Sequence, residues 1–210
     1  MLLSLSPAYA LAWLLARRRF PGRLLLDAAI HLPLVVPPVV TGWLLLLLFG
    51  RAGPVGGWLE EQFGITLVFR WTGAALAAAI MALPLMVRAM RLSIEAVDRR
   101  LVEAARVLGA SPWRAFLTIT LPLSAPGIAA GAMLGFARSL GEFGATITFA
   151  SNIAGETRTL PLAIYSGLQL PGAEAQVARL AVISIVLSIA ALLASELLVR
   201  RSAGARAHVL

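Results

Sequence analysis

The stretch EAARVLGASPWRAFLTITLP, residues 103–122, is a polar, arginine-bearing segment between two hydrophobic ones. Residues 95–108 contain good helix formers without proline or glycine, and Gly109 is suited to end this helix at its C′ position. Ser111 and Pro112 are suited to the N-cap and N1 positions of a second helix, which we expect the Leu121–Pro122 pair to end. The stretch therefore predicts two short helices that meet at a sharp turn.

The rest of the chain is strongly apolar. Of its 210 residues 60% are hydrophobic and 13% are charged, whereas a soluble domain carries about 25% charged residues. So little polar surface indicates an all-α polytopic membrane protein, a transmembrane helical bundle that forms a single domain over residues 1–210. The apolar runs predict five membrane spans, at residues 2–16, 32–49, 73–90, 123–143 and 177–199.

Two of these runs and one further segment have unusual features. Residues 2–16 would form a helix of only about 22 Å, short of a ~30 Å hydrocarbon core, and look like the second half of a span whose start is missing. In residues 32–49, the regular helix is expected to begin after Pro38. Residues 160–170 are too few to cross a membrane and predict a short re-entrant or surface-lying helix on the outer side.

The absence of certain residue types excludes several function classes. All 18 basic residues are arginine, and the formal net charge is +8. Without lysine the chain has neither a Walker A phosphate loop nor a Schiff-base lysine. Without cysteine it has no disulfide or thiolate metal site, and its two histidines are isolated in sequence. We therefore predict no catalytic residues, no bound metal and no cofactor.

The arginines also predict the orientation of the chain in the membrane. Thirteen of the 18 fall on one side of the predicted spans and four on the other, with Arg138 inside a span. Because arginine-rich loops stay in the cytoplasm, the thirteen mark the cytoplasmic side. The loop of residues 94–122 is then cytoplasmic, the N-terminus lies outside and the C-terminus inside. Basic loops that flank apolar spans are explained by this topology, so nucleic acid is not an expected partner.

The pattern alone leaves two interpretations of the cytoplasmic segment open. It could lie on the bilayer, with its arginines on anionic lipid headgroups, or it could dock to a protein. The segment resembles the EAA loop of ABC-importer permeases, whose pattern is E-A-A, three residues, G, nine residues, I-x-L-P. The matching residues are Glu103, Ala104, Ala105, Gly109, Ile119, Leu121 and Pro122.

This resemblance implies a function for the segment. In that family the two helices are coupling helices, which dock in a cleft of a cytosolic ATPase subunit. Glu103 would contact the ATPase, Ala104 and Ala105 would allow a close fit, and Gly109 would make the turn. Residues 111–114 (Ser111, Pro112, Trp113 and Arg114) would begin the second coupling helix. The missing Walker lysine agrees, because such a permease depends on a separate ATPase.

Two further stretches bear on the substrate. Residues 136–172 and residues 31–50 resemble the molybdate branch of these permeases, and sulfate and tungstate permeases share a looser version of the first stretch. The resemblance implies a homodimer in the bacterial inner membrane, with cytosolic ABC ATPase subunits and an extracytoplasmic molybdate-binding protein. Tungstate or sulfate remain alternative substrates.

The polar residues near the end of the fourth predicted span suggest a path for the anion. Hydroxyl and backbone donors can pass a dianion without holding it, so we expect a group of small and hydroxyl residues near the pore or outer gate. Arg138 and Glu142, one helical turn apart, are expected to form a structural ion pair beside it. The donor group is Ser139, Gly141, Gly144, Thr146 and Thr148.

Two other function classes are weighed against this one. A secondary transporter, working without ATP, would explain the spans but would leave the cytoplasmic helices without a function. An integral-membrane enzyme would need a metal cluster, a nucleophile elbow or a paired nucleophile and base, and the sequence contains no such pattern. The prediction is therefore a transport subunit and not an enzyme.

Overall fold

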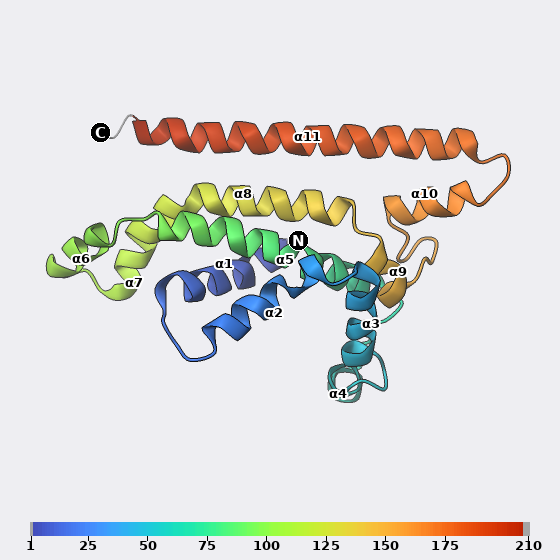
Figure 1. The fold of residues 1–210 in the computed structure, drawn as a ribbon, viewed down its shortest axis with the longest axis horizontal. Coiled ribbons are helices and arrows are strands. Elements are labelled where there is room, and N and C mark those ends of the chain that lie inside the picture. The colour runs from blue at the N-terminus through green and yellow to red at the C-terminus, as the bar shows by residue number, and fades with distance from the viewer. Residues whose placement is uncertain (1, 208–210) are drawn as a thin grey trace.

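The computed structural model describes residues 2–207, with the side chains of residues 3–194 and 197, and within that range every regular element is a helix. The predicted all-α fold is confirmed. Three long helices lie side by side: α5 (Trp71–Glu95), α8 (Leu121–Leu140) and α11 (Glu174–Ala207). Helix α8 lies between the other two (Figure 1). The helices within residues 2–63 lie on the side of α5 away from α11, whereas the short helix Leu160–Leu168 packs against α11.

Three of the predicted spans correspond to long helices of the structure. Helical stretches 71–95, 112–140 and 174–194 are long and apolar enough to cross a membrane. A fourth crossing is possible if α3 (Pro38–Phe49) and α4 (Pro54–Phe63), which meet at a 45° bend, form one broken span. Helix α1 (Leu2–Arg17), with 16 residues, is shorter than a full span. The number of five spans therefore stays a prediction.

The second predicted span is divided at its prolines. Helix α2 (Arg23–Val35) ends before Val36, which is extended with φ −73° and ψ 137°, and α3 begins at Pro38. A residue that precedes proline is disfavoured in the helical region, so Val36 breaks the helix. The expected start of the regular helix at Pro38 is confirmed. Helix α2 instead lies against α5, beyond the tight turn at Gly22 that joins it to α1.

Two predicted boundaries of the polar segment are wrong. Its first helix, α6 (Arg99–Val107), begins after Asp98, whose carboxylate caps it by accepting a 2.9 Å hydrogen bond from the Arg100 N–H. Its second helix does not end at the Leu121–Pro122 pair. Instead α7 (Pro112–Ala115) runs through a π-helical turn, η1 (Phe116–Thr120), directly into α8.

The π turn explains why proline is tolerated at position 122. In a π turn the N–H groups bond five residues back instead of four, so the regular hydrogen-bond ladder is already shifted where Pro122 lacks its donor. The proline therefore sits in the first turn of the continuing helix. Two further helices, α9 (Gly144–Ala150) and α10 (Leu160–Leu168), follow α8, and α10 is the short helix predicted near residues 160–170.

Helix α5 contributes to both apolar cores of the molecule. Met86, Met90 and Ile94 are buried against α1 and α2 in one core, while Met81 packs against Phe149 of α9 and residues of α3 in the other. By contrast, α11 leaves most of its apolar side chains exposed in the described region. Such a surface suits lipid or another subunit and not water.

The most extensive helix contact joins α5 and α8. Gly127, Gly131 and Gly135 are buried on one face of α8, as the four-residue spacing of small residues predicts. A Cβ at Gly127 would overlap the Ser93 side chain, and one at Gly135 would lie 2.7 Å from the Met86 sulfur. The Ser93 hydroxyl also donates a hydrogen bond to the Ser124 carbonyl across this contact. Glycine on α8 therefore sets how closely the two helices approach.

We expect Gly127→Ala to destabilise the protein by about 1–3 kcal/mol, because the added methyl overpacks the α5–α8 contact. Gly141→Ala is the matched control, since a Cβ there meets no atom within 4 Å. Thermal unfolding of both variants in detergent measures the difference. Equal unfolding midpoints for the two variants would contradict the account of this contact.

Candidate functional site

The turn between α6 and α7 has the geometry that its sequence predicts. Gly109 has a φ of +89°, which is a left-handed conformation that favours glycine. The Gly109 N–H donates to the Arg106 carbonyl and the Ala110 N–H to the Ala105 carbonyl, both at 3.0 Å. These two bonds form a Schellman motif. On the other side of the turn, the Ser111 hydroxyl accepts from the Arg114 N–H at 3.2 Å, so the predicted N-cap and the N1 proline are confirmed.

The residues of the EAA pattern lie at the surface. Helix α6 contains no buried residue, and Glu103 and Ala104 are exposed while Ala105 is half-buried. Trp113 is 67% exposed, although its ring stacks on Phe116 with the centroids 5.4 Å apart. This segment, residues 99–115, is called the coupling segment below. It offers both charged and apolar side chains to a partner.

Aromatic packing holds the coupling segment against α1. Phe116 lies 6.1 Å from Tyr9 and 6.3 Å from Trp13, measured between ring centroids. The Tyr9 hydroxyl is hydrogen-bonded at 2.8 Å to the hydroxyl of Ser124 in α8, about two helical turns beyond Phe116. Between α1 and the coupling segment is a cavity of about 350 Å³, lined by Trp13, Arg17, Arg99, Val102, Glu103, Arg106, Pro112, Phe116 and Thr120.

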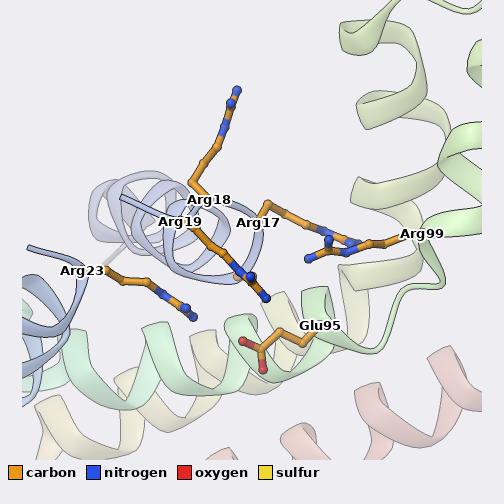
Figure 2. Close-up of a pocket in the computed structure, with 7 residues that line it drawn as sticks. Arg17, Arg18, Arg19, Arg23, Glu95 and Arg99 are labelled. Carbon is orange, nitrogen blue, oxygen red and sulfur yellow. The ribbon is translucent and has the colours of Figure 1, made fainter. Parts of the chain in front are cut away.

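Arg17 connects α1 to the point where the coupling segment begins. Its Nη2 donates to the Ile94 carbonyl at 3.0 Å and to the Val97 carbonyl at 3.2 Å. Ile94 lies in the last turn of α5, where its carbonyl also accepts a 3.3 Å hydrogen bond from the Val97 N–H, and Val97 follows the end of the helix. The pKa of Arg17 is lowered from its ordinary value, first by burial and then by the charge of Arg99, which lies close by (Figure 2). Positive charge is therefore concentrated here.

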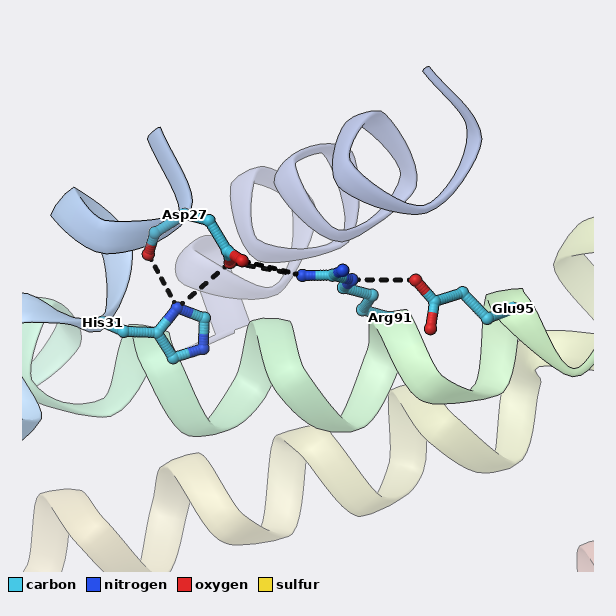
Figure 3. Close-up of polar contacts among 4 residues, drawn as sticks. All are labelled: Asp27, His31, Arg91 and Glu95. Carbon is cyan, nitrogen blue, oxygen red and sulfur yellow. Dashed lines mark hydrogen bonds and ion pairs between the residues drawn. The ribbon is translucent and has the colours of Figure 1, made fainter. Parts of the chain in front are cut away.

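A chain of ion pairs connects α2 to α5 (Figure 3). Arg91 Nη1 donates to both carboxylate oxygens of Asp27, at 3.2 and 3.1 Å, and Arg91 Nε donates to Glu95 Oε1 at 2.9 Å. His31 Nδ1 lies 2.8 Å from the Asp27 carbonyl oxygen and 3.3 Å from its carboxylate. The i,i+4 spacing of Asp27 with His31 and of Arg91 with Glu95 is visible in the sequence. The pairing of Asp27 with Arg91, 64 positions apart, cannot be seen there.

The predicted pair of Arg138 and Glu142 is present in the structure. Arg138 Nη1 lies 2.7 Å from Glu142 Oε2, and Glu142 is 2% exposed. The other carboxylate oxygen of Glu142 accepts a 2.8 Å hydrogen bond from the Ala145 N–H at the start of α9. Glu142 therefore joins the end of α8 to α9. Sequence reasoning missed α9, because its alternation of small, β-branched and aromatic residues is not typical of a helix.

The other gate candidates are brought together around α9, but their hydroxyls are already engaged. Ser139 donates to the Gly135 carbonyl and Thr148 to the Gly144 carbonyl, each at 2.8 Å within its own helix. Thr146 is buried, and Gly144 packs closely on Pro38 of α3. Gly141 is exposed. The role of these five residues in an anion path stays a prediction, and donation by Ser139 or Thr148 would require its hydroxyl to rotate.

The sequence matches known transport proteins over most of its length. Residues 8–204 match the family described as "Binding-protein-dependent transport system inner membrane component". The molybdenum transport system permease protein ModB of Haemophilus influenzae is 60% identical over 201 residues, covering 96% of this chain and 88% of that protein. ModB of Escherichia coli K12 is 59% identical over 202 residues with the same coverage. The sulfate transport system permease protein CysT of E. coli K12 is 43% identical over 159 residues, covering 76% of this chain and 57% of CysT.

Solved structures share the fold at much lower identity. A bacterial ABC transporter involved in the import of the acidic polysaccharide alginate superposes with a TM-score of 0.66 at 20% identity, covering 96% of this chain and 73% of the other. The MetNI methionine ABC transporter, in an inward-facing conformation, gives a TM-score of 0.66 at 16% identity, covering 94% and 85%. By its family match and its high identity to ModB, this chain belongs to the inner membrane components of binding-protein-dependent transport systems.

Proposed function

We propose that this chain is the permease subunit of an ATP-driven importer for molybdate. The observation that carries the proposal is the exposed helix–turn–helix of the coupling segment, between α5 and α8, which presents the first part of the EAA pattern, Glu103 to Gly109. The rest of the pattern, Ile119, Leu121 and Pro122, lies in the helix that continues from it. The high identity to two ModB proteins supports molybdate as the substrate. The 43% identity to CysT supports sulfate as the alternative, and tungstate is chemically close to molybdate.

The continuous helix from Pro112 to Leu140 supports a mechanism of coupling. When the ATPase subunits close, they would move the coupling segment, and α7 has no loop that could absorb this movement before α8. The displacement would pass along α8 to Arg138 and Glu142, and from Glu142 to α9. The permease would then alternate between two discrete arrangements, biased by the nucleotide state of the ATPase.

The remaining partners follow from this proposal. Two copies of the chain would form the path, with the coupling segment, the C-terminus and the arginine-rich ends in the cytoplasm and the N-terminus outside. A periplasmic binding protein would deliver the oxyanion. The alginate transporter of the same fold has been solved in complex with its ligand-bound periplasmic protein, which supports this kind of partner. ATP hydrolysis is assigned to the separate ATPase.

The substrate can be tested by competition uptake in proteoliposomes that contain the permease, its ATPase and its binding protein. We expect unlabelled molybdate to compete strongly with labelled molybdate, tungstate to compete comparably, and sulfate to compete at least about tenfold less well. Sulfate competing as well as molybdate would move the assignment to the sulfate branch. Uptake that persists without the ATPase, driven by an ion gradient, would replace the proposal with a secondary transporter.

Coupling can be tested at Gly109, where a side chain has space but the backbone is left-handed. We expect Gly109→Val to abolish transport-coupled ATP hydrolysis, because a β-branched residue is strained there by about 1–2 kcal/mol and would distort the turn. Gly109→Asn is the matched control, since asparagine tolerates this conformation, and it should retain most of the coupling. Equal coupling in both variants would show that the turn geometry is dispensable.

The role of Arg138 and Glu142 can be tested with glutamine substitutions, since glutamine at position 142 keeps an acceptor for the Ala145 N–H. Arg138→Gln and Glu142→Gln singly should each lower stability by about 3–5 kcal/mol and impair transport, because each leaves a charge without its partner. The double variant should recover both properties. If it assembles with a normal unfolding midpoint but does not transport, at least one of the two residues acts directly on the substrate.

A further inference from the structure

A basic cavity of about 630 Å³ opens where the turn between α1 and α2 meets the end of α5 and the start of α6. Five arginines and one carboxylate line it, and the side chains gather from both sides of the opening (Figure 2). We call it the arginine cavity. Its charged lining residues are Arg17, Arg18, Arg19, Arg23, Arg99 and Glu95.

The positive charge of the arginine cavity is poorly compensated by the chain itself. Glu95 already accepts from Arg91 at 2.9 Å. Within the described residues, the side chains of Arg19, Arg23 and Arg99 take part in no hydrogen bond or ion pair. In Figure 2, the Arg19 and Arg23 side chains extend toward the same space as Glu95. Three guanidinium groups are therefore available to an anion.

The other two arginines are engaged elsewhere. Arg17 donates to the Ile94 and Val97 carbonyls, and its lowered pKa reflects burial together with repulsion from Arg99. Arg18 extends away from the cavity in Figure 2, with its guanidinium carbon 5.7 Å from the Trp13 ring centroid. An anion in the cavity would reduce the repulsion between Arg17 and Arg99. It would not have to displace Arg17 or Arg18 from the contacts that they already make.

The chemistry and the position of the cavity both favour a phosphate group. A guanidinium presents paired donors that match phosphate oxygens, and several of them together bind a tetrahedral oxyanion. The cavity lies at the ends of α1 and α5, on the side that the arginine distribution assigns to the cytoplasm, where anionic headgroups accumulate. We propose that Arg19, Arg23 and Arg99 bind a phosphate group here, supplied by the headgroup of an anionic phospholipid.

This site is separate from the anion path, and of the coupling segment only its first residue, Arg99, takes part in it. The gate candidates lie at the opposite end of α8, and Glu103 and Trp113 do not line the arginine cavity. Binding of phosphate here is therefore independent of whether the transported anion is molybdate or sulfate. A diffuse attraction of basic residues to the bilayer is the competing explanation, and it would not depend on which arginines are present.

The test uses the assembled permease–ATPase complex in nanodiscs of phosphatidylglycerol and phosphatidylcholine, with retained lipid counted by native mass spectrometry. We expect the wild type to retain phosphatidylglycerol preferentially and the double variant Arg19→Ala/Arg23→Ala to retain at least about tenfold less of it. The matched control is Arg70→Ala/Arg179→Ala, which removes the same charge outside the cavity and should behave as wild type. Lysine at positions 19 and 23 should restore retention only in part, because it keeps the charge and loses the paired donors.

A second arm identifies the source of the phosphate. Inorganic phosphate is titrated onto the complex in neutral detergent, and the unfolding midpoint is followed for wild type and for the double alanine variant. An unfolding midpoint that rises with phosphate only in the wild type, without preferential retention of phosphatidylglycerol, would assign the site to free phosphate.

Two results would overturn the proposal. One is that the wild type neither retains phosphatidylglycerol preferentially nor gains stability from phosphate. The other is that the cavity variant and the control variant lose the same amount of lipid. If the double variant does not assemble, Arg23→Gln alone is judged by the same two measurements.

Discussion

The close approach of α5 and α8 is the contact on which the other features depend. It is possible because α8 presents glycine at three successive turns, where larger residues would collide with Ser93 and Met86. The two helices flank the coupling segment in the chain, so their contact also fixes the distance between the segment's two ends. Both apolar cores then form along α5, and Met86 and Met90 of the first core also contact the α8 glycines. The three glycines of α8 thus determine where the larger side chains of both cores can pack.

The coupling segment is held at its ends and left open between them. Arg17 engages the carbonyls at the end of α5, and Phe116 packs on the aromatic residues of α1. The exposed residues between these two anchors make few contacts within the chain. This arrangement suits a surface that has to be recognised by a partner and also has to transmit force, because recognition needs exposure and transmission needs fixed ends.

The sequence predicted best the features that depend on neighbouring residues. Gly109, Ser111 and Pro112 act as caps because the bonds they make span only a few residues, and the pair of Arg138 and Glu142 is formed within one helical turn. It predicted poorly the features that depend on distant partners. Asp27 meets Arg91 across 64 positions, and α9 is stabilised by burial against α3 and α5 in spite of its β-branched residues. The helix through Pro122 was missed because a π turn leaves no clear mark in the sequence.

The π turn at residues 116–120 has a consequence for chain length. A π turn accommodates one residue more than an α turn. The side chains before and after the turn therefore point in the same relative directions as they would in a regular α-helix that is one residue shorter. A single-residue deletion between positions 116 and 120 would then convert the turn to α-helix while Trp113 and the glycine face of α8 keep their relative orientation. A deletion of the same size on either side of the turn would rotate one end against the other by about 100°. The turn is thus a place where this helix can lose a residue without changing the direction in which either end points.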